Sequence, residues 1–200
     1  NNNLNLTSTD LELMRDGGDK QLVGLRFNNI EVPQGATITS AAITFEVDEK
    51  RTGKLDVDIY GEDSSQPLRY SDSAKISTRT KTSAKVDWAI TTKPGKNASL
   101  STPDLTSLVQ EIVNRGDWAN SNSMAFILEE SPGSKDNYRE LESYNGESGA
   151  AAQLDISYTY STAAADNDYI ALRFQNLRIP QGADITDAPL PFVAAADTSA

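Results

Sequence analysis

Apolar and polar residues alternate along much of the chain, and turn residues separate the alternating runs. The clearest runs are 23–27, 43–48 and 55–60. A period of two is typical of strands with one buried face, whereas a helix repeats about every 3.6 residues. We therefore predict an all-β fold built as an antiparallel β-sandwich. Further strands are expected at 124–128, 140–144 and 154–160.

One segment has helical periodicity instead. Thr102 suits the N-cap, Pro103 suits the first helical position, and Gly116 suits the stop. The sequence therefore predicts one α-helix over about 102–115, which caps an open end of the sandwich. Its apolar face consists of Leu105, Leu108, Val109, Ile112 and Val113.

The composition limits the possible partners. A net charge of −11 and a pI near 4.4 disfavour binding to nucleic acid and to other polyanions. Neither cysteine nor histidine is present, so any chemistry would depend on carboxylates, and we expect no enzymatic activity.

No apolar run reaches the roughly 18 residues of a membrane span. The chain is rich in Asn, Ser, Thr, Gly and Asp, which favours a protein outside the cell or on a bacterial surface. It does not begin with Met, as expected either of a mature form after signal removal or of a cut fragment.

A stretch of the chain occurs twice. Residues 25–39 read LRFNNIEVPQGATIT, and residues 172–186 read LRFQNLRIPQGADIT. Matches at turn and core positions together indicate an internal repeat. The sequence thus divides into an N-terminal arm (1–8), a sandwich module (9–161) and a partial second repeat (162–200) that covers only the first two strands of a module.

Three quoted motifs carry a family resemblance. LELMRDGGDKQLVGLRFNNIEVPQGATITSAAITFEVDE, TPDLTSLVQEIVNRGDW and ESYNGESGAAAQLDISY follow one another in this order. Together they resemble tandem modules of large secreted bacterial proteins related to the DNRLRE, or disaggregatase-related, group. The resemblance implies a jelly-roll-like β-sandwich. It also implies either a carbohydrate-binding module beside a polysaccharide-degrading enzyme or a unit of an adhesin-like array.

The runs 43–48 and 55–60 predict a β-hairpin with an acidic outward face. Pairing Val47 with Val57 places carboxylates directly opposite one another, and such like-charge pairs are destabilising. Either nearby lysines screen this solvated face or a hard cation binds there. Oxygen ligands without imidazole or thiolate suit Ca²⁺. The candidate ligands are Glu46, Asp48, Asp56 and Asp58.

Turn aspartates form a second candidate calcium site. Asp16 and Asp19 flank two glycines, and Asp166 and Asp168 stand in the corresponding turn of the second copy. Turn aspartates also commonly bond the local backbone, which is the alternative explanation.

Aromatic residues in polar loops are the candidates for glycan binding. Tyr138 and Tyr144 lie in loops rich in glycine and serine, where a sugar could stack. Because the acidic surface repels polyanions, a neutral sugar is expected. Trp118, which follows the helix stop, is expected in the core.

Two functions are compatible with the sequence. In the first, the chain is a structural or adhesive subunit whose partial repeat binds another copy by β-strand addition, which builds head-to-tail filaments. In the second, it is a carbohydrate-binding module of a secreted enzyme. The expected assembly interface is the apolar set Ile170, Leu172, Phe174, Leu177, Ile179, Leu190 and Phe192.

Overall fold

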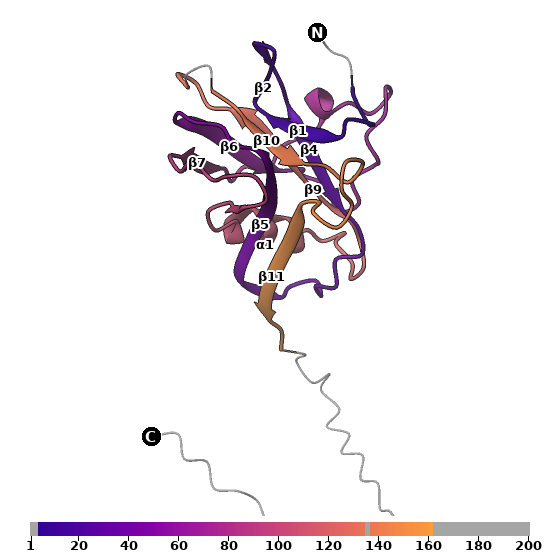
Figure 1. Ribbon diagram of the computed structural model, residues 1–200. Coiled ribbons are helices and arrows are strands. Elements are labelled where there is room, and N and C mark those ends of the chain that lie inside the picture. The colour runs from indigo at the N-terminus through magenta and orange to yellow at the C-terminus, as the bar shows by residue number, and fades with distance from the viewer. Residues whose placement is uncertain (1–3, 135–136, 162–200) are drawn as a thin grey trace, which may run out of the picture. The chain divides into compact units, whose positions relative to one another are not determined.

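The structure is a computed structural model that describes residues 4–134 and 137–161. The expected partial repeat, 162–200, and the assembly residues within it lie outside the described residues. The described chain is mostly antiparallel β-sheet with one α-helix, so the all-β prediction is confirmed (Figure 1). The strands are β1 (Asp10–Leu13), β2 (Arg15–Asp16), β3 (Asp19–Lys20), β4 (Val23–Phe27), β5 (Thr37–Glu49), β6 (Leu55–Gly61), β7 (Val86–Ile90), β8 (Ser99–Ser101), β9 (Met124–Glu130), β10 (Arg139–Glu142) and β11 (Gln153–Thr159).

The first sheet is organised around β5, its longest strand. The order is β1-β10-β5-β11, and β8 also pairs with β5. The strands β10 and β11 follow one another along β5: β10 pairs near its C-terminal end, and β11 pairs from Thr37 to Thr44 (Figure 1). The second sheet has the order β4-β9-β6-β7.

Side chains from both sheets form one hydrophobic core. Phe45 on β5 stacks on Trp88 of β7 with ring centroids 6.0 Å apart, which joins the two sheets face to face. Trp118 is 3 % exposed, and its indole N–H donates to the carbonyl of Val32 at 2.9 Å, so its expected place in the core is confirmed.

The predicted hairpin between the runs 43–48 and 55–60 is wrong. These runs belong to β5 and β6, which lie in different sheets and do not pair. Alternation specifies which face of a strand is buried but not which strand lies beside it. In separate sheets both apolar faces reach the shared core, and the carboxylate ladder expected from the hairpin does not form.

A buried arginine secures the connection between these two strands. The Arg139 guanidinium is fully buried and donates to the carbonyls of Gly53, at 2.7 Å, and of Thr92, at 3.0 Å. Burial lowers the pKa of this guanidinium. Arg139 thereby ties the β5–β6 loop to the segment that follows β7.

The helix is shorter than predicted. It is α1, Thr106–Val113, and a short 3₁₀ turn, η1, spans Ile76–Thr78. Thr102 does not cap the helix, because its Oγ1 accepts the N–H of Ile43 at 3.0 Å. The apolar face of α1 is buried as expected and contacts both β5 and β6. With eight residues, the α-helix of the described part falls far short of the length needed to cross a membrane.

Side chains take the place of a neighbouring strand along the N-terminal half of β5. Gln110 accepts the N–H of Ile38 at 2.8 Å and donates to the carbonyl of Ala36 at 2.9 Å. Asp104 accepts the N–H of Ala41 at 3.2 Å. Hydrogen bonding from the Thr106 hydroxyl and the Ala41 amide lowers the pKa of the Asp104 carboxyl. This edge of β5 is therefore closed to further strands.

Candidate functional site

The structure separates the four carboxylates of the first predicted calcium site. Glu46 and Asp48 lie on β5 in one sheet, whereas Asp56 and Asp58 lie on β6 in the other. The described residues contain no group of three or more Asp or Glu side chains placed to hold a metal ion. The site predicted from the hairpin is therefore not assembled in this form.

Lysines neutralise three of these carboxylates. Asp58 is the most buried of them, at 4 % exposure, and it also accepts a hydrogen bond from the Ser131 hydroxyl. Hydrogen bonding from Lys96 holds the pKa of Asp48 below its usual value. The ion pairs are Lys96 with Asp48 at 2.6 Å, Lys54 with Asp56 at 2.9 Å, and Lys85 with Asp58 at 3.1 Å.

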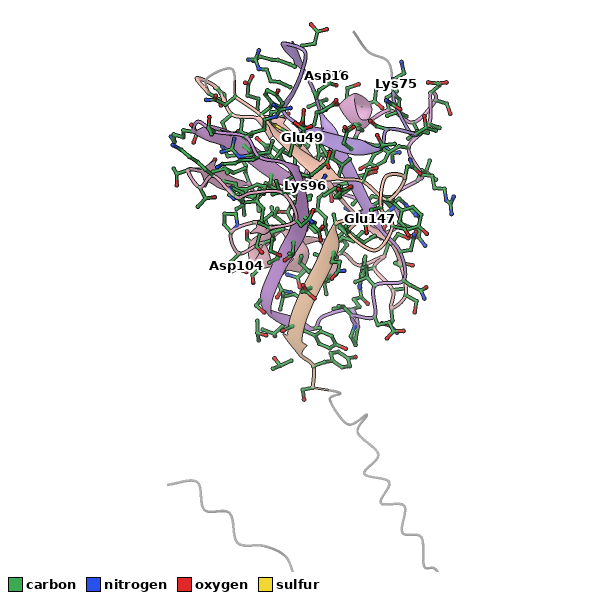
Figure 2. All side chains as sticks on the ribbon, in the orientation of Figure 1. Asp16, Glu49, Lys75, Lys96, Asp104 and Glu147 are labelled. Carbon is green, nitrogen blue, oxygen red and sulfur yellow. The ribbon has the colours of Figure 1, made fainter. Side chains whose placement is uncertain are left out.

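The second predicted calcium site is only partly described. Asp16 and Asp19 are exposed and lie directly opposite each other in the β2–β3 hairpin, with Asp16 at its tip (Figure 2). Asp166 and Asp168 lie outside the described residues.

Like-charge pairs do occur, but with partners that the sequence did not indicate. Asp58 on β6 lies opposite Asp87 on β7 and opposite Glu129 on β9. Glu12 lies opposite Glu140, and Asp10 lies opposite Glu142, across β1 and β10. Burial, followed by the charge of Asp16, raises the pKa of Glu12. Burial, followed by the charge of Asp48, raises the pKa of Glu142. Like charges of the kind expected in the hairpin therefore face each other between other pairs of strands.

The candidate sugar-stacking residues differ in access. Tyr144 is 74 % exposed, whereas the Arg51 guanidinium lies over the ring of Tyr138 at 4.8 Å from its centroid. One face of Tyr138 is therefore covered by a cation. Of the two, Tyr144 is the residue that presents a ring to solvent.

An open groove runs beside β11, and its lining combines apolar side chains with the polar residues Asn28, Asn29 and Glu31. Its volume is about 400 Å³. One wall is the inward face of β11, and the other is the chain that continues from the end of β4. The apolar lining residues are Leu154, Ile156 and Tyr158 from β11 and Phe27, Ile30 and Val32 opposite them.

The outer edge of β11 is free of partner strands in the described part of the chain. β11 ends its sheet and pairs with β5 alone. Its outward residues Gln153, Asp155 and Ser157 are exposed. Tyr158, on the groove side, is 39 % exposed. β11 therefore offers unpaired backbone groups next to apolar side chains that are incompletely covered, which is the combination that accepts an added strand.

Comparison of the chain with protein-family models and with curated proteins finds no match. The family resemblance therefore rests on the three sequence motifs alone.

The Glu142→Gln variant should be more stable than the wild type at pH 7, by about 1 kcal/mol, because a repulsive buried charge is removed. The pKa of Glu142 is raised in the folded state, so the folded protein binds this proton more readily than the unfolded chain. The contribution of Glu142 to stability therefore declines as the pH rises through that pKa.

Thermal melts from pH 4 to pH 8 check this expectation. The advantage of Glu142→Gln should shrink toward pH 4, where wild-type Glu142 is protonated. Asp72→Asn, at an exposed position, is the control. A stability difference that is independent of pH would contradict the assignment.

Calcium binding stays a prediction of the sequence. A bound divalent cation would offset repulsion between carboxylates, so millimolar Ca²⁺ should raise the melting temperature of the full chain and excess EDTA should lower it. Mg²⁺ at equal ionic strength is the control. An unchanged melting temperature with and without EDTA would rule out a stabilising calcium ion.

Proposed function

We propose that this chain is a non-enzymatic extracellular structural subunit, folded as a jelly-roll-like β-sandwich, that joins copies of itself head to tail by β-strand addition. The observation that carries the proposal is the free edge of β11 beside a groove whose β11 wall is apolar. The composition rich in Asn, Ser, Thr, Gly and Asp and the resemblance to tandem secreted modules support the extracellular assignment.

The free edge is favourable for binding because both its backbone and its side chains gain from a partner. An added strand would satisfy the outward N–H and C=O groups of β11, as a ladder does within a sheet. It would also cover Leu154, Ile156 and Tyr158. Fully burying a side chain of this kind contributes roughly 1.5–3 kcal/mol, and these residues are already partly buried, so each gains a fraction of that amount.

The chain itself contains a suitable partner segment. Residues 162–200 include the apolar interface set named from the sequence, among them Ile170, Leu172 and Phe174. They repeat the sequence of β4 and of the first part of β5. A two-stranded unit is marginally stable by itself in water, so this segment needs a surface to bind.

The geometry of such a contact determines the form of the assembly. The acceptor edge and the donor segment are different surfaces of the same chain, so the contact is heterologous. A heterologous contact that does not close into a ring continues from copy to copy. We therefore propose a filament or a surface array as the product.

Deleting residues 162–200 should abolish assembly and leave a folded monomer. The truncation removes no residue of the described core, which runs from Leu13 to Leu141 with partly buried residues up to Ile156. Light scattering after size exclusion and electron microscopy of both chains, over a range of concentrations, measure the result. If the truncated chain forms the same filaments as the full chain, the proposal is wrong.

The second candidate function is that of a carbohydrate-binding module, and the exposed ring of Tyr144 favours it. Binding to a neutral glycan on an array should then fall at least about tenfold in Tyr144→Ala, because ring stacking is lost. Tyr138→Ala should have a smaller effect because Arg51 covers that ring. Signal confined to uronate polymers, or signal unchanged by Tyr144→Ala, would contradict this function.

A further inference from the structure

The free edge of β11 has two chemically different sides. Leu154, Ile156 and Tyr158 point to the groove, whereas Asp155 and Ser157 lie on the exposed outer side. No salt bridge to Asp155 occurs among the described residues. A matching donor strand therefore needs alternating apolar residues on one face and a cation on the other.

We propose that residues 170–174 of a neighbouring copy pair antiparallel with β11, with Arg173 opposite Asp155. This inference rests on the proposed function and names its donor, its acceptor and their register. The donor reads Ile-Ala-Leu-Arg-Phe, so apolar residues alternate with Ala171 and Arg173.

One antiparallel register satisfies both sides of the edge. With Arg173 opposite Asp155, the large apolar residues Ile170, Leu172 and Phe174 of the donor each face Tyr158, Ile156 or Leu154 of β11. A shift by one residue would turn the apolar side chains to solvent, and a shift by two would lose the ion pair. The facing pairs are Ile170 with Tyr158, Ala171 with Ser157, Leu172 with Ile156, Arg173 with Asp155 and Phe174 with Leu154.

The parallel orientation fits less well. With Arg173 again beside Asp155, Ile170 would lie next to Ala152, beyond the start of β11. Tyr158, which is 39 % exposed, would then stay uncovered. Only the antiparallel orientation covers the groove side of β11 from Leu154 to Tyr158.

The donor does not suit the place that β4 itself occupies. Residues 170–174 repeat β4, so exchange of β4 between copies is the obvious alternative. Ala171 corresponds to Gly24, and a Cβ atom at Gly24 would lie 2.6 Å from Cζ of Tyr70 and 2.9 Å from Cγ1 of Ile76. Both side chains would have to move, so addition at a free edge is favoured over replacement of β4.

β7 is an edge strand of the second sheet, so it is the alternative acceptor to compare with β11. It also carries an outward aspartate, Asp87, between inward apolar residues. However, Lys85 already pairs with Asp87 at 2.7 Å, and Trp88 and Ile90 are 6 % and 2 % exposed. A strand added there would cover little apolar surface, so β11 is the better acceptor.

A neighbouring copy is a more suitable source of the donor than the same copy. Within one chain, pairing of Ile170 with Tyr158 would leave the eleven residues 159–169 as a hairpin loop. Hairpin loops usually have about two to five residues. Head-to-tail assembly also requires the donor to leave its own copy.

Disulfide trapping in the full chain tests the register, because the chain contains no cysteine. Ser157→Cys with Ala171→Cys places two thiols directly opposite each other in the proposed pairing, where a disulfide can form. Ser157→Cys with Arg173→Cys is the control for register. Ala89→Cys with Ala171→Cys is the control for β7, because Ala89 takes the equivalent exposed position on that strand.

The expected result is a ladder of disulfide-linked multimers on non-reducing gels, at least about tenfold stronger for Ser157→Cys/Ala171→Cys than for either control. A cross-linked monomer would show that the donor binds its own copy and would overturn the inference. Equal ladders in the β7 control would overturn it as well.

Electron microscopy of the same variants under reducing conditions separates this inference from the proposed function. Filaments without a cross-link at Ser157 would contradict the register while the proposed function stands. The absence of both filaments and cross-links would contradict both.

A charge exchange provides a second test of the Asp155–Arg173 pair. Asp155→Arg and Arg173→Asp should each raise the concentration needed for assembly by at least about fivefold, and the double variant should recover most of that loss. Asp72→Arg is the control for net charge, because Asp72 is exposed and far from β11 in sequence. Losses in the double variant that equal the sum of the single losses would contradict the pairing.

Discussion

The strand β5 depends on hydrogen bonding along both of its edges, and the positions of β10, β11, α1 and the core follow from it. One edge pairs with β10 and β11 in succession. The other pairs with β8 and then with the side chains of Thr102, Asp104 and Gln110. A thirteen-residue strand with an open edge would leave many backbone groups without partners in the fold. The side chains before and within α1 supply these partners and hold the helix against the core.

β11 differs from β5 because only one of its two edges has hydrogen-bonding partners among the described strands. Its inner edge is satisfied by β5, but its outer edge has no strand partner in the described part of the chain, and its apolar side chains line an open groove. Natural proteins commonly protect such edges with charges, prolines or covering loops. Here Asp155 is the charge on the edge itself, which suits a cationic donor better than a second copy of β11. The proposals on assembly follow from this asymmetry.

The position of each strand also determines which cations and which carboxylates lie next to its acidic side chains. Asp48, Asp56 and Asp58 each have a lysine partner, and separating β5 from β6 removes the four-carboxylate ladder that a hairpin would impose. Like charges still face each other in the pairs Glu12–Glu140, Asp10–Glu142 and Asp58–Asp87. Arg51 relieves part of this repulsion by binding Glu140, with Nη2 at 2.6 Å from Oε2. Burial is the main cause of the raised pKa values of Glu12 and Glu142, and the charges of Asp16 and Asp48 add to it.

The sequence by itself determined the runs that form β4, β6, β9, β10, β11 and part of β5, the helical face and the burial of Trp118, because alternation and helical spacing depend on local geometry and on which side chains avoid water. It did not determine the partners of each strand, since β5 and β6 have equally suitable apolar faces for one hairpin or for two sheets. The helix start was placed too early because Thr102 and Asp104 bond the distant strand β5, and local capping rules do not include such contacts. The groove and free edge of β11 were decided by tertiary structure alone, because an edge exists only once the order of strands in a sheet is set.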